Sequence, residues 1–180
     1  MSPGEVLGIG IGTVALAMAT PPLFQMFWGR PNITFQFTRL ENSVDTLLLA
    51  HIYNYPVTNR FLSGMGVRRD EAHFHVAMTV SGSDGNQILK YTEPPFTSGN
   101  PFRPIQFQLR PGPAPITLEI LGANGKTARL YTEERRDSYH EFKSGNYVLR
   151  LDAWVGEKVF FESRTFVVTE DSRKSYWAEN

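Results

Sequence analysis

The sequence predicts an all-β protein, an antiparallel sandwich of about eight or nine strands preceded by one N-terminal transmembrane helix. Three observations support this fold class. After residue 30, apolar and polar residues alternate with the two-residue period of half-buried strands. Turn-forming residues separate these runs at near-regular spacing. Before them, 24 residues from Val6 to Gly29 carry no charge, and a helix of about 20 such residues crosses a bilayer core.

Length and composition narrow the classes of protein that remain. The 180 residues are enough for one globular domain of ordinary size. We divide the chain into a membrane anchor (1–29), a sandwich domain (30–170) and a polar tail (171–180) that we expect to fray. Basic and acidic residues both number 18, and the resulting zero net charge argues against nucleic acid as a partner. The chain contains no cysteine, which excludes disulfides, thiolate metal sites and cysteine nucleophiles.

The apolar N-terminal run is interpreted as a membrane anchor that contacts lipid through residues 6–28. Trp28 lies where an interfacial aromatic residue belongs, and Arg30 is the first basic residue. The alternative is a secretory signal peptide, because Ala17-Met18-Ala19 has the small-x-small form of a cleavage site. The anchor is favoured because residues 1–5 contain an acid and no lysine or arginine.

Two further features of this run concern packing and orientation. Gly8 and Gly12 have the spacing that lets membrane helices approach closely, as in a homodimer. The favoured explanation is simpler, namely that glycine is common in membrane helices. Arg30 and Arg39 follow the run and no basic residue precedes it. By the positive-inside rule, these two arginines favour a cytoplasmic sandwich. Cleavage after Ala19 would instead give a secreted or periplasmic domain.

The strands expected after the anchor are residues 33–38, 45–54, 72–81, 87–92, 105–110, 116–120, 127–132, 147–155 and 159–169. The run 45–54 is almost continuously apolar, which is typical of a central strand. Glycine-containing hairpin turns are expected at residues 83–86, 124–125 and 156–157. Seven of the twelve prolines lie between Pro94 and Pro115, which favours loops or an edge strand there.

The segment Ser144–Leu151, with sequence SGNYVLRL, resembles the start of the penultimate strand of immunoglobulin-like domains, where Gly-x-Tyr forms the tyrosine corner. The resemblance implies an immunoglobulin-like sandwich, a Tyr147 hydroxyl that turns back onto upstream backbone, and a final strand at residues 159–168. Leu149 stands where antibody-type domains carry their second cysteine, and residues 72–81 contain no tryptophan. The chain is therefore at most a disulfide-free relative, and the resemblance implies no function.

His73 and His75 form the sharpest constellation of chemically active residues. Alternation places both imidazoles and Glu71 on the solvent side of one strand. Two histidines and a carboxylate are a plausible transition-metal set, which leaves open a metal-binding domain or a metal-dependent enzyme. Surface histidines on a polar strand face are the favoured interpretation, because no third and fourth ligand can be placed.

The absence of catalytic and cofactor-binding motifs from the sequence favours a non-catalytic protein without a cofactor. The sequence contains no Gly-x-Ser-x-Gly motif, no phosphate-binding glycine loop and no calcium loop. With the anchor, this favours a membrane-anchored binding or assembly module, such as an accessory subunit with protein partners at the membrane. Loops 61–71, with Arg68 and Arg69, and 94–115, with Phe96 and Phe102, are the binding candidates. If the N-terminus is cleaved, a secreted carbohydrate- or surface-binding sandwich is the alternative.

Overall fold

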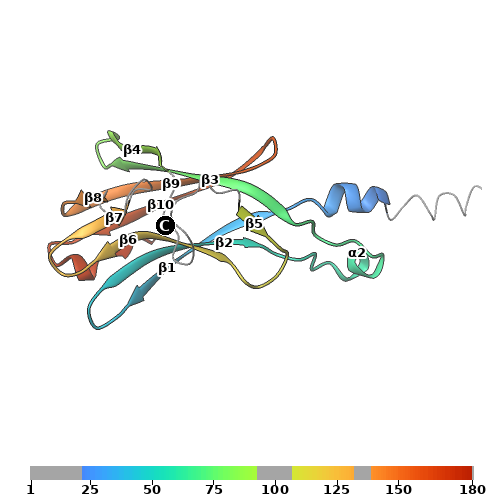
Figure 1. Cartoon of the computed structure of the whole chain (residues 1–180), viewed down its shortest axis with the longest axis horizontal. Coiled ribbons are helices and arrows are strands. Elements are labelled where there is room, and N and C mark those ends of the chain that lie inside the picture. Colours follow the sequence, from blue (N-terminus) through green and yellow to red (C-terminus); the bar gives the residue numbers. More distant parts are fainter. Residues whose placement is uncertain (1–21, 93–106, 132–138, 180) are drawn as a thin grey trace, which may run out of the picture.

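The computed structural model describes residues 22–92, 107–131 and 139–179. Two antiparallel sheets pack face to face (Figure 1). One sheet contains β1 (Ile33–Glu41), β2 (Thr46–Asn54), β6 (Ile116–Ala123), β7 (Ala128–Tyr131) and β8 (Tyr139–Phe142), in that order. The other has the order β11 (Tyr176–Trp177), β10 (Lys158–Val168), β9 (Gly145–Val155), β3 (Ala72–Gly82) and β4 (Gln87–Thr92), with β5 (Phe107–Leu109) paired to β3. The predicted all-β sandwich is confirmed.

Local sequence explains most of these elements. β2 lies between β1 and β6, as its continuously apolar run predicts. The expected turns join β3 to β4, β6 to β7 and β9 to β10. Gly85 and Gly156 have φ angles of 79° and 59°, which glycine adopts because it lacks a Cβ atom. The short strands β8 and β11 are additions that the sequence pattern does not predict, since four and two residues are too few to show a period.

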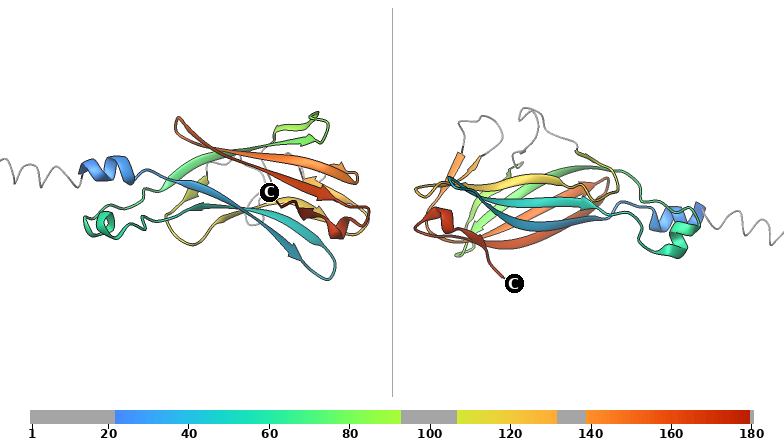
Figure 2. Two further views of the ribbon diagram at one scale, coloured as in Figure 1. Left: turned by 180° about the vertical axis from the view of Figure 1, so that it is seen from behind. Right: turned by 90° about the horizontal axis from the view of Figure 1, so that it is seen from below.

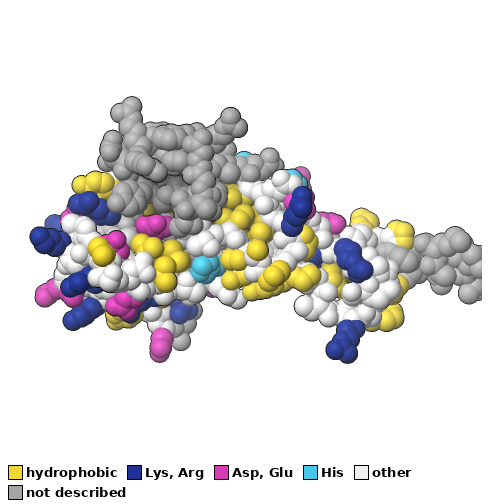
Figure 3. Space-filling model, turned by 60° about the horizontal axis from the view of Figure 1, so that its bottom comes forward, with side chains coloured by type: hydrophobic (Ala, Val, Ile, Leu, Met, Phe, Trp, Pro, Cys, Tyr) yellow, Lys and Arg dark blue, Asp and Glu magenta, His cyan; other side chains and the backbone are white. Residues whose placement is uncertain are grey.

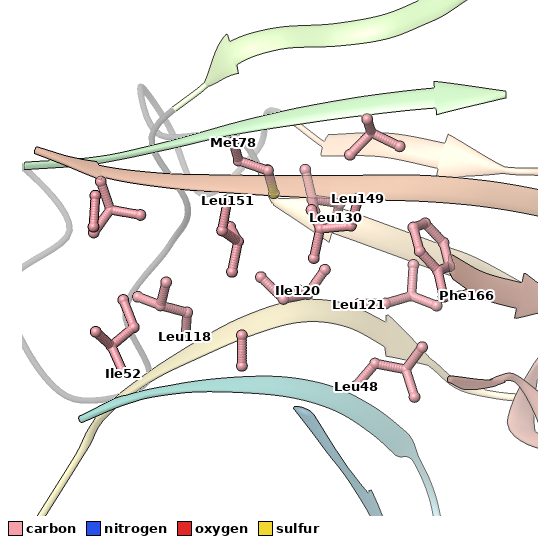
Figure 4. Close-up of a cluster of buried hydrophobic side chains, with 14 of the residues drawn as sticks. Leu48, Ile52, Met78, Leu118, Ile120, Leu121, Leu130, Leu149, Leu151 and Phe166 are labelled. Carbon is pink, nitrogen blue, oxygen red and sulfur yellow. The ribbon is translucent and has the colours of Figure 1, made fainter. Parts of the chain in front are cut away.

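The hydrophobic core lies between the two sheets. Alternation along each strand sends every second side chain into this layer, and Figure 4 shows these side chains pointing toward one another from both sheets. Those that are completely buried include Leu48, Ile52, Met78, Leu118, Ile120, Leu121, Leu149, Leu151 and Phe166. Burying one such side chain contributes about 1.5–3 kcal/mol, so this layer is the main source of stability.

The Tyr147 hydroxyl turns back onto backbone just upstream, as the sequence resemblance implies. The Tyr147 hydroxyl donates a hydrogen bond to the Lys143 carbonyl oxygen, with an O···O distance of 2.9 Å. Its ring stacks on Phe166 and meets Phe142 edge-on. Burial raises the pKa of Tyr147, which extends the pH range over which the hydroxyl is protonated and can donate. The expected residues 159–168 form most of β10, although the short β11 follows that strand.

The polar tail does not fray as the sequence predicts, because it packs along the sandwich. Residues Ser172–Lys174 form a short 3-10 helix, η1, and β11 then pairs with β10. The Arg173 carbonyl accepts hydrogen bonds from Thr46 Oγ1 at 2.6 Å and Arg39 Nη2 at 3.0 Å. Trp177 Nε1 donates to the Thr38 carbonyl at 2.9 Å. The tail therefore joins β10 of one sheet to β1 of the other, a long-range contact that tail composition does not reveal.

We expect Trp177→Ala to lower the free energy of unfolding by about 2–3 kcal/mol. The substitution removes the ring that lies between Phe37 and Phe166, with centroid distances of 4.8 and 5.9 Å, together with the Thr38 hydrogen bond. Urea unfolding of the full chain in mild detergent measures the effect. Tyr176→Ala, at the exposed neighbouring position of β11, is the matched control. Equal losses in both variants would contradict a specific role for Trp177.

Two short helical segments lie at one end of the sandwich. Residues 22–28 are helical, and α2 (Arg60–Gly64) interrupts a stretch that the sequence predicts as loop. Within residues 22–92, 107–131 and 139–179, no helix is long and apolar enough to cross a membrane. Most of the predicted anchor, including Gly8, Gly12 and the Ala17-Met18-Ala19 motif, lies outside the described residues.

Candidate functional site

The helical residues 22–28 join the sandwich next to the loop that carries α2. All three views place these two segments side by side, beyond the end of the sheets (Figures 1 and 2). β1 and β3 begin at this end, and β2 finishes there. We call residues 22–30 and 55–70 together the N-terminal junction. This junction contains Arg68 and Arg69, two of the residues singled out by the sequence.

Gln25 fixes the helical residues to the α2 loop. Its Nε2 donates to the Arg68 carbonyl and to Asp70 Oδ1, both at 2.8 Å. Its Oε1 accepts from the Arg68 backbone N–H at 2.9 Å. The Asp70 N–H adds a bond to the Gly29 carbonyl. Because the side chain uses both its donor and its acceptor, residues 22–29 have a defined direction relative to the sandwich.

Arg69 holds the same junction together from the other side. Its Nη1 donates to the carbonyl oxygens of Trp28 and Arg30 at 3.0 and 2.7 Å, and its Nε donates to the Tyr55 carbonyl at 3.2 Å. Three neutral carbonyls satisfy much of the planar guanidinium. The sequence proposes Arg69 as a ligand-binding residue, whereas these contacts give it a structural role.

Arg68 lies on the exposed side of the loop. Its Nη1 donates to the Ser63 and Val67 carbonyls at 3.0 and 3.2 Å. These bonds close the loop around α2, while the side chain stays exposed and charged. Phe96 and Phe102, the other two proposed binding residues, lie outside the described residues.

Local sequence determines how α2 is presented. Asn59 is the N-cap, and its Oδ1 accepts from the N–H groups of Phe61 and Leu62 at 3.0 and 3.2 Å. Leu62 and Val67 turn toward the protein and are buried. Neighbouring residues on a helix differ by about 100° in direction, so Phe61 points away from Leu62. Its side chain is 68% exposed, the highest value among the large apolar residues described.

Asn54 connects the sandwich to the junction. Its side chain is completely buried, where Nδ2 donates to the Asp70 and Leu109 carbonyls at 2.8 and 3.2 Å. Its Oδ1 accepts from the Asn32 N–H at 3.3 Å. One side chain thus joins the last residue of β2 to the segments that lead into β1 and β3 and to the end of β5.

The proposed metal set is only partly brought together. His73 and His75 are exposed on the outward face of β3, as alternation predicts. Glu71 precedes this strand, and its Oε1 lies 3.4 Å from Arg110 Nε without a hydrogen bond. Among the described residues, no three His, Cys, Asp or Glu side chains are grouped so that they could hold a metal ion. Both imidazoles lie at the surface of β3.

His51 has the most constrained imidazole of the described histidines. It bridges three strands, with Nε2 2.7 Å from Thr38 Oγ1 on β1 and Nδ1 2.9 Å from Thr117 Oγ1 on β6. A neutral imidazole offers one donor and one acceptor, and each hydroxyl can take either role. Burial lowers the pKa of His51, which is consistent with a neutral, structural residue.

We expect acid to destabilise the protein through His51. Because its folded-state pKa lies below the unfolded value of about 6.5, the unfolded chain binds the proton more readily. The contribution of His51 to the free energy of unfolding is therefore fully present above pH 6.5 and is lost as the pH falls through its folded-state pKa. His51→Gln should therefore show a smaller loss between pH 7 and pH 5 in urea unfolding. His73→Gln controls for the loss of one imidazole, and identical pH dependence in both variants would refute the assignment.

No protein family model, curated protein or solved structure matched this chain. Sequence reasoning did not find Gln25 or Asn54, because their partners lie up to 45 and 55 residues away. A polar residue at the end of an apolar strand was the only local signal for Asn54.

Proposed function

We propose that this protein is a membrane-anchored, non-catalytic binding or assembly module that displays a β-sandwich beside the membrane. The observation that carries the proposal is the N-terminal junction. The uncharged run from Val6 to Gly29 ends in the helical residues 22–28, and the hydrogen bonds of Gln25 and Arg69 hold these residues to the sandwich. A flexible tether would need none of these bonds. A rigid connection supports a role in which the sandwich has a set direction relative to the membrane.

The direction of the sandwich determines which loops face away from the membrane. The turns β1–β2, β3–β4 and β6–β7 lie at the end opposite to the N-terminal junction (Figure 1). Turns on a rigid scaffold are the usual place for recognition residues. Concentrating such a module at a surface raises its effective concentration for partners there. We therefore place protein recognition at these distal turns rather than at the 61–71 loop.

The finer fold assignment is also a proposal, namely a disulfide-free variant of the immunoglobulin-like sandwich. The tyrosine corner at Tyr147 and the neighbouring strands β3, β9 and β10, in the order expected for C, F and G, support it. The second sheet departs from the family order ABED. Next to β2 lies β6, followed by β7 and β8 in a meander, whereas in the family the strand beside B follows its outer neighbour in sequence.

The test compares three proteins in the native membrane: the full chain, a chain lacking residues 6–21, and residues 1–29 fused to an unrelated soluble domain. We expect the full chain to resist alkaline carbonate extraction and the deletion to be released. After mild-detergent purification, a stoichiometric partner should accompany the full chain but not the fusion. Release of the full chain would overturn the anchor. Purification of the full chain alone, or as a self-dimer, would overturn the assembly role.

A further inference from the structure

The N-terminal junction exposes an unusual number of large apolar side chains. Leu23, Met26, Phe27 and Trp28 are 54%, 57%, 62% and 47% exposed, and Phe61 is 68% exposed. Phe24 connects the two groups, because its ring lies 4.9 Å from Trp28 and 6.5 Å from Phe61. These residues form one continuous patch, which we call the apolar tip. Its members come from the helical residues 22–28 and from α2.

Basic side chains accompany the apolar tip. The junction contains Arg30, Arg60, Arg68 and Arg69 but a single acid, Asp70. Figure 3 shows basic and hydrophobic side chains next to one another at this end. Within the described ranges, none of these four arginines forms an ion pair with a carboxylate, whereas Arg39, Arg110, Arg129, Arg150 and Arg173 do. A chain of zero net charge thus concentrates positive charge here.

We propose that the apolar tip is a lipid-binding surface through which the sandwich itself docks on an anionic phospholipid bilayer. Phe61 enters the interfacial region, and Arg60 and Arg68 face the phosphate groups. The inference rests on the proposed membrane anchor and extends it, since α2 belongs to the folded domain. The occupant follows from continuity, because residues 22–28 are the last part of the uncharged run. It follows also from charge, because juxtamembrane arginines are attracted to anionic leaflets.

The residue types of the apolar tip are compatible with a membrane interface. Aromatic rings and arginines with apolar stems are the side chains that occupy the boundary between headgroups and acyl chains. α2 is too short to form a groove or a helix-binding face, but it presents one aromatic ring at its exposed side. Two attachments, the run before residue 22 and the ring of Phe61, would prevent the sandwich from rotating freely about its anchor.

The absence of cysteine makes the test direct. Phe61→Cys in the full chain is labelled with an environment-sensitive fluorophore and reconstituted into vesicles of neutral or partly anionic phospholipid, with or without brominated acyl chains. Val44→Cys is the matched control, since Val44 is 67% exposed on the β1–β2 turn. We expect brominated lipid to quench the label at position 61 several-fold more than at position 44. Aqueous iodide should show the reverse order.

The charge contribution is tested in the labelled Phe61→Cys background. Arg60→Gln should weaken docking on anionic vesicles by about fivefold, because one basic residue near such a surface contributes about that factor. Raising the salt concentration should weaken it in the same direction. Lys126→Gln, at an exposed position of the distal β6–β7 turn, is the control and should have no effect. An equal response to both substitutions would overturn the electrostatic part.

Flotation of the vesicles separates the two proposals. If the chain floats but position 61 is as accessible to iodide as position 44, the lipid-binding surface is wrong and the anchor stands. If position 61 is protected from iodide without quenching by brominated lipid, protein covers the apolar tip, for example a second copy, and the inference is also overturned. If the chain does not float, the anchor fails and the lipid-binding surface fails with it.

Discussion

Phe166→Ala is expected to lower the free energy of unfolding by about 3–5 kcal/mol. Phe166 is completely buried, and its ring contacts those of Phe142, Tyr147 and Trp177 at centroid distances of 5.6, 5.3 and 5.9 Å. These partners come from β8, β9 and β11. The substitution therefore opens a cavity at the point where the tyrosine corner, the tail and both sheets meet.

Urea unfolding of the full chain in mild detergent, followed by tryptophan fluorescence, measures this loss. The midpoint should fall while the dependence of the unfolding free energy on urea stays constant. Since a domain of this kind has only about 5–15 kcal/mol of stability, Phe166→Leu serves as a milder variant with the same direction of effect. Phe161→Ala, on the outward face of the same strand and 60% exposed, is the control. A loss of equal size at Phe161 would contradict the predicted core position.

Asn54→Ala is expected to lower the free energy of unfolding by about 2–4 kcal/mol, because it removes the hydrogen-bond partner of one buried and two partly buried backbone groups. The groups are the Asn32 N–H and the carbonyls of Asp70 and Leu109. Asn54→Asp should not restore stability, although the shapes match, because a carboxylate cannot donate to the two carbonyls. Asn146→Ala, on the exposed face of β9, should have little effect.

Hydrogen exchange gives this prediction a local readout. Compared with the unmodified protein, Asn54→Ala should accelerate exchange at the amide of Asn32 more than at amides in the centre of β2. The reason is that the lost bond protects only the start of β1. Uniform acceleration across the sheets would instead indicate general destabilisation and would contradict a local role. The result bears on the proposed function as well, since Asn54 bonds to Asp70, whose side chain accepts a hydrogen bond from Gln25.

Parts of the candidate site were accessible from sequence and parts were not. The outward position of His73 and His75 follows from the period of a strand, and the loop position of Arg68 and Arg69 follows from the break in that period. What these residues contact does not follow. Arg69 bonds to backbone carbonyls at residues 28, 30 and 55, which a sequence motif cannot specify because any residue supplies a carbonyl.

The sequence by itself determined the all-β sandwich, the central position of β2 and the three glycine turns, and a resemblance within it implied the bond from the Tyr147 hydroxyl to upstream backbone. Each depends on local chemistry: a two-residue period, a backbone conformation open to glycine, or a bond to the carbonyl four residues away. Only the tertiary structure decided that the polar tail closes the sandwich through Trp177, that Asn54 and Gln25 fix the N-terminal junction, and that Phe61 joins the exposed apolar patch. Those contacts join residues far apart in the chain, and they exist only after the sheets have packed and brought the segments together.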